Sequence, residues 1–409
     1  MSMMEDEGRR TKKWVWGCTG GCLGFLVIVG LGIYLMVWYI KRPMPVVPAE
    51  AFIGPETSSF LILRVEPGDE LMTTAVARMM LDARLIERLP SKEGAGPQMN
   101  MERSRELIRT AAPVQTVLVL SASEDAKRLS GGAALAVRGF FRIFSWQFSN
   151  MLSSRANSTR YKGATLASIN DESYGGVRGN NFMYATSESV MRGWVDRIAD
   201  YRRQAEQAPE GEEPKVRLTG SPALKSAYQR LDAAQPVRLA VDNSRGELGA
   251  FANLLEKETQ KTFRDLGLAS DRIETVSAQI APEQAPRAPV TAFIKCADSD
   301  FAESLRERLQ MAVEEVGEQL PVKDVEFSLQ EEDLLEVRGT IPDLPAQAGR
   351  LARYATRKLE TKMKARERAA EPKQEPEPAT EQPEQPSEAG PEEPAQPGET
   401  DEQPAAASP

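Results

Sequence analysis

Residues 14–40 constrain this chain more than any other stretch, because they contain no charged side chain. As a helix rising ~1.5 Å per residue, the 22 positions of residues 17–38 cover about 33 Å, close to the ~30 Å hydrocarbon core of a bilayer. A secretory signal has a shorter apolar run, and the one cleavage-site pattern, residues 49–51, lies roughly ten residues further on. A lipoprotein cysteine follows its apolar stretch, whereas Cys18 and Cys22 precede most of this one. The segment is predicted to be a permanent transmembrane anchor.

The basic residues around this segment predict its orientation. Four of them stand within residues 9–13, and two, Lys41 and Arg42, follow the segment. Because positive charge accumulates on the cytoplasmic side, we expect the N-terminus in the cytoplasm and the chain after Pro43 outside it.

Aromatic and small residues complete the predicted anchor. Tryptophan and tyrosine favour the two membrane interfaces, and glycines four residues apart let two membrane helices approach closely. Self-association of the span is one interpretation, and the ordinary glycine content of membrane helices is the other. The residues assigned to the anchor are Trp14, Trp16, Gly17, Gly21, Gly24, Trp38 and Tyr39.

Composition excludes several classes of function. The formal net charge of −9 and the pI near 5.1 argue against nucleic acid as the main partner, which requires a basic surface. The chain has no histidine, so histidine-dependent nucleophiles, histidine-ligated zinc and histidine acid–base catalysis are excluded. Cys296 is the one cysteine after the predicted anchor, so no disulfide is expected within that region. No cofactor or metal motif is present, and none is predicted.

The order of predicted elements repeats along the chain. A short apolar strand, an acidic turn and an amphipathic helix recur, and "VEPGDEL" at residues 65–71 matches "VDNSRGEL" at residues 241–248. The sequence therefore predicts an α+β fold of two tandem, related modules behind the membrane helix. The predicted boundaries are a cytoplasmic N-terminus at 1–13, the anchor at 14–40, a spacer at 41–57, a first module at 58–205, a linker at 206–218, a second module at 219–368 and a tail at 369–409.

The last residues of the chain have a different composition. Residues 371–409 hold ten prolines, eleven acids and one base, with no aromatic or large aliphatic side chain. Such a segment cannot bury enough apolar surface to offset the entropy of ordering, so we expect a disordered tail.

Two segments outside the anchor are candidate interaction surfaces. The aromatic stretch at residues 139–152 predicts a helix whose Phe140, Phe144 and Phe148 share a face, which suits either the membrane surface, a lipid-like ligand or burial between layers. Residues 170–181 read as a Gly/Asn-rich loop suited to recognition, with Asn170, Tyr174 and Asn181 as its candidate residues.

One acidic group also has two interpretations. Asp298, Asp300 and Glu303 bunch together, but they lack the spacing and the glycine of an EF-hand calcium loop. A strand-to-helix turn with Asp300 as the helix N-cap and Glu303 as its capping-box partner explains them more simply.

The layout of residues 14–365 resembles uncharacterised bacterial families that carry an N-terminal anchor and a large extracytoplasmic α+β region of duplicated units. The resemblance implies a single-pass protein of the inner membrane and brings no catalytic residues. We therefore expect a non-enzymatic envelope protein that binds or scaffolds a partner, either an envelope protein or a lipid-like ligand. Its first helix is expected to hold it in the lipid bilayer. The alternative is a carboxylate-dependent hydrolase, which needs two facing acids.

Overall fold

The structure is a computed structural model that describes residues 46–83, 100–122, 129–137, 142–170, 173–209, 214, 216, 218–253, 257–281, 286–316 and 320–370. The chain divides into two units, Met1–Arg357 and Lys358–Pro409. Of the second unit, the structure describes residues 358–370, which form the end of helix α10.

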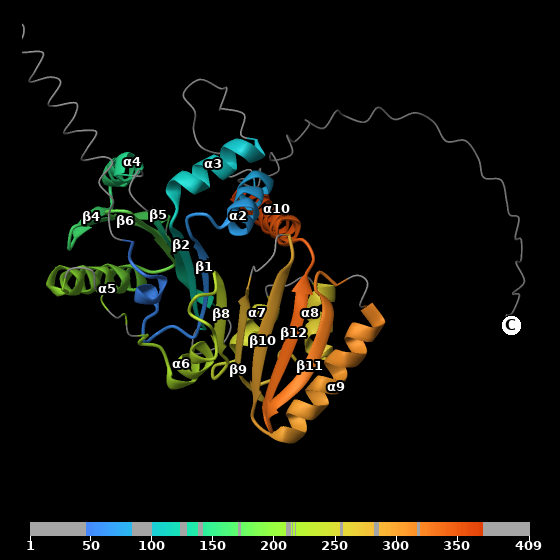
Figure 1. The fold of residues 1–409 in the computed structure, drawn as a ribbon. Coiled ribbons are helices and arrows are strands. Elements are labelled where there is room, and N and C mark those ends of the chain that lie inside the picture. The colour runs from blue at the N-terminus through green and yellow to red at the C-terminus, as the bar shows by residue number, and fades with distance from the viewer. Residues whose placement is uncertain are drawn as a thin grey trace, which may run out of the picture. The chain divides into compact units, whose positions relative to one another are not determined.

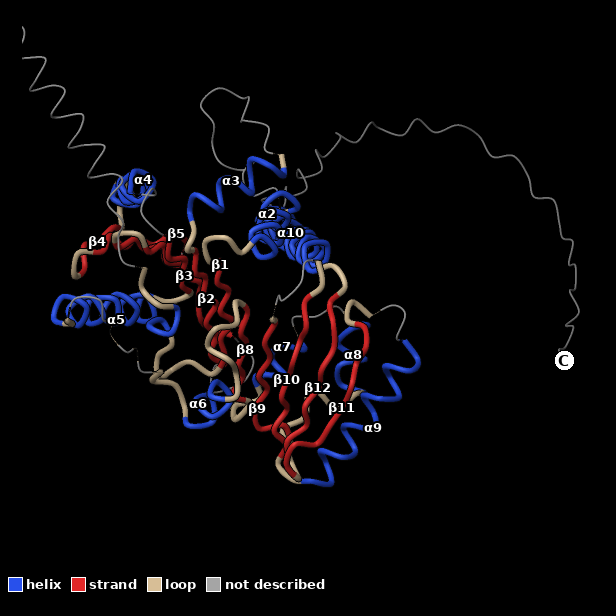
Figure 2. Tube along the Cα trace, in the orientation of Figure 1, coloured by secondary structure: helices blue, strands red, loops and turns tan. Residues whose placement is uncertain are grey.

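One large antiparallel sheet organises the first unit (Figures 1 and 2). The described strands lie in the order β11-β12-β10-β9-β8-β1-β2-β3-β7-β6-β5-β4. Their bounds are β1 Ser59–Val65, β2 Val114–Ala122, β3 Leu129–Val137, β4 Ser158–Tyr161, β5 Ala164–Asn170, β6 Ser173–Arg178, β7 Asn181–Ala185, β8 Val237–Asp242, β9 Ile273–Ile280, β10 Ala288–Cys296, β11 Lys323–Glu331 and β12 Leu334–Ile341. With helices packed on this sheet, the predicted α+β class is confirmed.

Helices lie on both faces of the central strands. The first face, on which Leu63 and Val65 of β1 lie, packs against α2, α3 and α10 at one end and against α7 and α9 over the strands that follow β8. The second face, on which Phe60 and Ile62 lie, packs against η1, α5 and α6. The bounds of the helices are η1 Ala49–Phe52, α2 Glu70–Asp82, α3 Met101–Ala111, α4 Arg142–Ser153, α5 Glu188–Gln207, α6 Pro222–Gln229, α7 Glu247–Ala252, α8 Lys257–Asp265, α9 Ser299–Val316 and α10 Leu344–Ala370.

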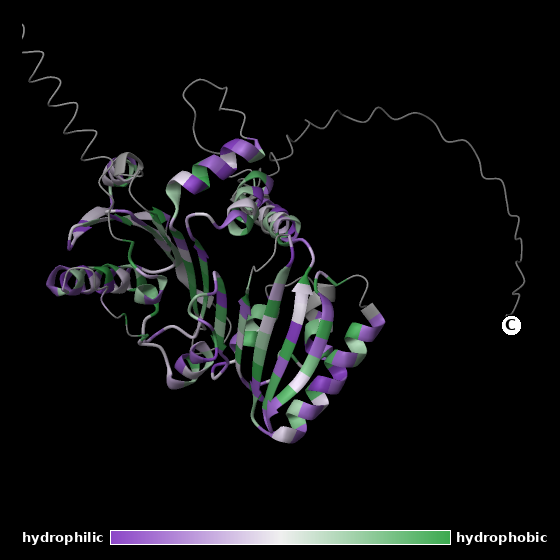
Figure 3. Cartoon of the chain, in the orientation of Figure 1, coloured by the Kyte–Doolittle hydropathy of each residue, from purple (hydrophilic) through white to green (hydrophobic). Residues whose placement is uncertain are grey.

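The strands β10, β12 and β11, at the end of the sheet beyond β8 and β9, are amphipathic, as Figure 3 shows. In β11, Phe327 and Leu329 alternate with the polar Glu326, Ser328 and Gln330. The two apolar residues contribute to the core beneath α9. This period of two is typical of a strand buried on one face alone.

The two halves of the sheet meet at one strand pair, β1 in the first half of the chain and β8 in the second. β1 and β8 are antiparallel neighbours, with Leu61 opposite Leu239 and Ile62 opposite Arg238. Read outward from this pair, one side runs β1-β2-β3-β7-β6 and the other runs β8-β9-β10-β12-β11, and the first side then adds the hairpin β4–β5. The halves thus share one continuous sheet and do not form two separate sheets.

Residues 46–57, which the sequence analysis assigns to a spacer, are part of the core instead. Val47, Phe52 and Ile53 are each 1 % exposed and pack on the second face. Side chains from distant parts of the chain bond to this backbone: Gln115 Oε1 accepts from the N–H of Ala49 (3.0 Å), Arg197 donates to the carbonyls of Ala51 (3.0 Å) and Phe52 (3.2 Å), and Thr219 donates to the carbonyl of Ile53 (3.0 Å). The prolines of this segment suggest a spacer, but its apolar side chains suit a buried position.

A buried ionic cluster joins this segment to the second half. Arg238 of β8 is fully buried, and its Nη2 lies 2.9 Å from Glu50 Oε1. The Tyr228 hydroxyl of α6 donates to the same carboxylate oxygen (2.8 Å) and accepts from Arg238 Nη1. Burial raises the pKa of the Glu50 carboxyl, but the Arg238 guanidinium, a backbone hydrogen bond and the Tyr228 hydroxyl together outweigh burial, so this pKa lies below its usual value. Burial, together with the Glu50 carboxylate, raises the pKa of Tyr228 to about 12.

We predict that Arg238→Met destabilises the protein by about 3–5 kcal/mol, because it leaves the buried Glu50 carboxylate without its cation. The free energy of unfolding from urea titration measures this effect. Adding Glu50→Gln to the variant removes the unpaired charge and should recover about half of the loss or more. Arg245→Met, at an exposed arginine, is the control and should change stability by less than about 0.5 kcal/mol. Equal losses for both arginine variants would contradict this prediction.

Candidate functional site

The residues predicted to form the anchor lie outside the described part of the chain. This applies to Trp14, Trp16, Gly17, Gly21, Gly24, Trp38 and Tyr39. Among the residues that the structure does describe, no helix has the length and apolar character needed to cross a membrane. The anchor therefore stays a prediction.

The aromatic stretch forms α4, which packs on the first face of the outer strands. Phe148 lies edge-to-face against Phe182 of β7, with ring centroids 5.6 Å apart, and Leu152 is buried beside them. Trp146 is 64 % exposed on the same helix. Phe140 lies outside the described residues, and the side chain of Phe144 is not described. One face of α4 is thus buried on the sheet while Trp146 faces solvent.

The segment 170–181 is not the loop that the sequence suggests. Residues 173–178 form β6, paired with both β5 and β7. Asn181 is fully buried, and its amide donates to the carbonyl of Arg178 (3.1 Å), so it stabilises the β6–β7 turn. Asn170 ends β5 and accepts from the Ser173 hydroxyl (2.7 Å). Because glycines are rare in strand interiors, the sequence "YGGV" at residues 174–177 suggests a loop.

Tyr174 and Phe148 lie on opposite faces of the sheet. Tyr174 pairs with Ala185 of β7 and packs on the core of the second face, whereas Phe148 belongs to the first face. The two candidate surfaces are therefore separate.

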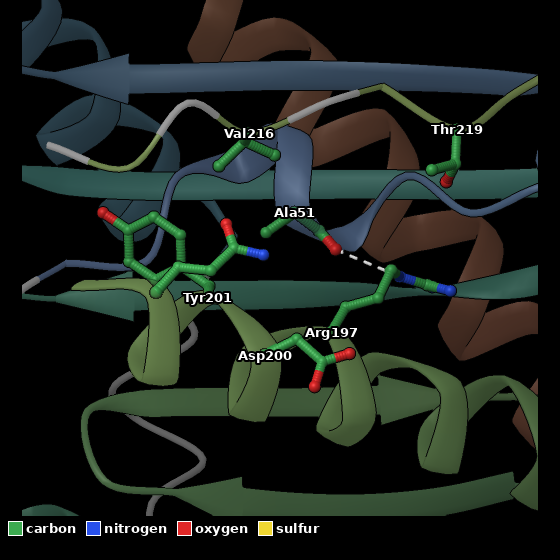
Figure 4. A pocket seen from close by; sticks show the side chains of 7 residues that line it. Ala51, Arg197, Asp200, Tyr201, Val216 and Thr219 are labelled. Atoms are coloured by element: carbon green, nitrogen blue, oxygen red, sulfur yellow. Dashed lines mark hydrogen bonds between the residues drawn. The ribbon is translucent and has the colours of Figure 1, made fainter. Parts of the chain in front are cut away.

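A cavity of about 370 Å³ lies beside α5 on the second face (Figure 4). Its walls come from α5, from η1 and from the segment between the halves, and they consist of Ala51, Arg197, Asp200, Tyr201, Gln204, Val216 and Thr219. Burial lowers the pKa of the Arg197 guanidinium, which bonds to two carbonyls of the buried segment and to Glu56 (3.3 Å). Asp200 pairs with Arg203 at 3.3 Å. The charged groups of this cavity thus already stabilise the fold.

Two further cavities lie elsewhere on the first unit. One, of about 430 Å³, is lined by three glycines together with Asn253, Arg264 and Ser270 near α7 and α8. The other, of about 340 Å³, lies between the strands β4, β5 and β6 and the first turns of α5, and Tyr174 is among its lining residues.

These three cavities bear on the hydrolase alternative. The 370 Å³ cavity is lined by one carboxylate, Asp200, and the 340 Å³ cavity by one, Glu188. Retaining or inverting glycoside hydrolysis needs two facing carboxyl groups, which none of these described cavities provides. The hydrolase alternative stays a prediction without support here.

The acidic group after β10 forms a helix start, as the simpler interpretation expects, but with a different cap. α9 begins at Ser299, and Asp298 Oδ1 accepts from the N–H of Phe301 (2.9 Å), so Asp298 takes the position predicted for Asp300. Arg272 pairs with both carboxylate oxygens of Asp298 (2.7 and 2.6 Å). Within the described residues, no group of three acids or cysteines is placed to hold a metal ion.

Cys296 is buried at the end of β10 in the core beneath α9. Burial, with smaller contributions from nearby Asp333 and Asp298, raises the pKa of its thiol to about 11. A raised thiol pKa favours the neutral, unreactive form at neutral pH. The cysteine is thus protected from pairing with other thiols.

We predict slow alkylation of Cys296 in the native protein. A pKa near 11 in place of 9 lowers the thiolate fraction at pH 8 about 100-fold, and the rate should rise as the pH approaches 11. The measurement is the rate at which iodoacetamide alkylates the protein. Cys18 and Cys22 are changed to serine, so that Cys296 is the remaining thiol. The urea-unfolded protein is the reference, and native and unfolded rates within tenfold of each other would contradict burial.

Comparison with known proteins adds no relative. The chain matches no protein-family model, no curated protein and no solved structure.

Proposed function

We propose that this protein is a single-pass membrane protein whose α+β region binds or scaffolds a partner outside the cytoplasm without catalysing a reaction. Residues 14–40 hold it in the bilayer, its N-terminus is cytoplasmic, and its folded part lies on the other side of the membrane. The partner is a component of the cell envelope, and the span also offers glycine pairs for self-association.

The observation that carries the proposal is the burial of the segment that follows the predicted span. The span ends at residue 40, and Val47 is already 1 % exposed in the core. Seven residue steps reach at most about 25 Å, so the folded region is held close to the membrane surface. The segment is also bonded to β2, α5, β8 and α6, which come from both halves. A short tether that leads directly into the core suits a protein that presents a surface or a cavity close to the bilayer.

We further propose that the two halves are related modules. Two observations support it: the strand order is the same on both sides of the β1–β8 pair, and the matched segments "VEPGDEL" and "VDNSRGEL" follow these two central strands. The second half has no counterpart of the hairpin β4–β5, so the modules have diverged at their outer edges.

Protease accessibility tests the topology. Protease added to spheroplasts should digest the chain beyond Pro43 and leave a small membrane-held fragment that contains residues 14–40. Because the folded region is compact, the digestion is performed with and without mild urea, and lysed spheroplasts give the control for full access. Protection of the whole chain would show the opposite orientation. A soluble product that begins near residue 52 would show that residues 14–40 are removed as a signal peptide.

The tail is proposed to be a solvated extension that adds nothing to the folded region. Eleven acids and ten prolines in residues 371–409 disfavour both regular structure and docking. We predict that truncation after Ala370 changes the Tm of the protein in nanodiscs by no more than about 2 °C, measured by differential scanning fluorimetry. A decrease of about 5 °C or more would indicate folded contacts of the tail.

A further inference from the structure

The cavity of about 340 Å³ next to β4 is built by three neighbouring strands and a helix. On the second face, Thr159 of β4 lies opposite Leu166 of β5, and Ser168 of β5 lies opposite Tyr174 of β6. Asn157 precedes β4, and Glu188 and Met191 of α5 complete the lining. Because β4–β5 is the hairpin that the second half lacks, this cavity belongs to the first half alone.

Gly176 of β6 lets α5 lie close to the sheet in this region. A Cβ atom on Gly176 of β6 would lie 2.7 Å from the Met191 sulfur and 2.9 Å from Leu166 Cδ2. Glycine at this position therefore lets α5 approach the sheet closely, and Met191 and Leu166 are almost completely buried between α5 and the sheet.

Three polar side chains that line the cavity are neutral and available, whereas the Ser168 hydroxyl already donates to the carbonyl of Asn170 (2.7 Å). Within the described part of the chain, the side chains of Asn157, Thr159 and Tyr174 make no hydrogen bond, and each can both donate and accept. The one charged lining residue, Glu188, is already paired with Arg192 at 2.6 Å. The Tyr174 ring is partly buried against the core, which fixes its position.

We propose that this cavity binds a neutral, hydroxyl-rich ligand, namely a ring of a neutral saccharide. Hydroxyl groups both donate and accept, as do the amide, hydroxyl and phenol of these three lining residues. The partly exposed Tyr174 ring suits the carbon-bound face of a sugar ring. A charged ligand would lose hydration without an unpaired opposite charge to replace it. The volume lies at the lower end of the range of about 300–1,000 Å³ that small-molecule sites occupy.

This assignment rests on the proposed binding function and names the class of ligand for it. The two are tested separately, because topology is read by protease on spheroplasts and ligand binding is read on purified protein. Either result can fail while the other holds.

The experiment is ligand-observed NMR with calorimetry on the full chain in phosphatidylcholine nanodiscs, which avoids sugar-based detergents. The neutral probes are cellobiose and N,N′-diacetylchitobiose, and the charged probes are glucuronic acid and glucosamine. Trialanine tests whether the neighbouring edge strand β4 captures a peptide instead. We expect at least one neutral probe to bind with a Kd of about 1 mM or tighter and the charged probes to bind at least about fivefold more weakly.

Two variants locate the binding. Tyr174→Phe and Asn157→Ala each remove one hydrogen-bonding group, so each should weaken binding of the neutral probe about 2–10-fold. Tyr184→Phe and Asn150→Ala, at an exposed tyrosine and an exposed asparagine outside the cavity, are the matched controls and should have no effect. Unchanged thermal unfolding confirms that each variant is folded. The absence of neutral-probe binding, a preference for trialanine or for a charged probe, or equal effects of the controls would each overturn the assignment.

Discussion

The antiparallel pairing of β1 with β8 is the contact on which the rest of the structure depends. It joins β2, β3 and the strands beyond them to β9, β10 and theirs, so that the two halves share a core. The same register places Ile62 beside Arg238 on the second face. A guanidinium at the centre of a buried sheet needs a counter-ion, since burial of an isolated charge is costly. Glu50 supplies it from a segment that precedes both strands, so strand pairing, charge compensation and the packing of residues 46–57 depend on one another.

The two halves share a strand order but differ where their outer strands lie. In the first half, the hairpin β4–β5 extends the sheet beyond β6, and α5 covers apolar residues such as Leu166 and Met183 on the second face. In the second half, the outer strand β11 alternates apolar residues with polar ones, and α9 packs on the apolar side. At the outer end of the first half, helices thus lie on both faces of the sheet, α5 on the second and α4 on the first, whereas at the outer end of the second half α9 lies on the first face.

Periodicity predicts elements such as α9 and the hairpin of β11 and β12, because burial on one face dictates alternation in "KDVEFSLQE" and a 3.6-residue repeat in α9. It does not predict β6, whose Gly176 is explained by the close approach of Met191 from a helix that comes later in the chain. The burial of residues 46–57 was equally hidden, since it depends on Gln115, Arg197, Thr219 and Arg238, all distant in sequence. Of the residues that line the smallest of the three cavities, Tyr174 was named from the sequence. Asn157 and Thr159 were not, because they are ordinary polar residues that strand pairing alone brings beside it.

The burial of residues 46–57 has a mechanical consequence. A force applied to the chain ahead of Val46 does not reach the end of an edge strand, where a sheet separates one hydrogen bond at a time. It passes into β2 through Gln115, into α5 through Arg197 and into β8 through Glu50 and Arg238. These elements lie on both sides of the central strand pair, so the load is shared in parallel and opposed by the centre of the sheet. Tension on the chain ahead of Val46 would thus be resisted by the whole folded region, and extraction of this short segment would have to disrupt the core itself.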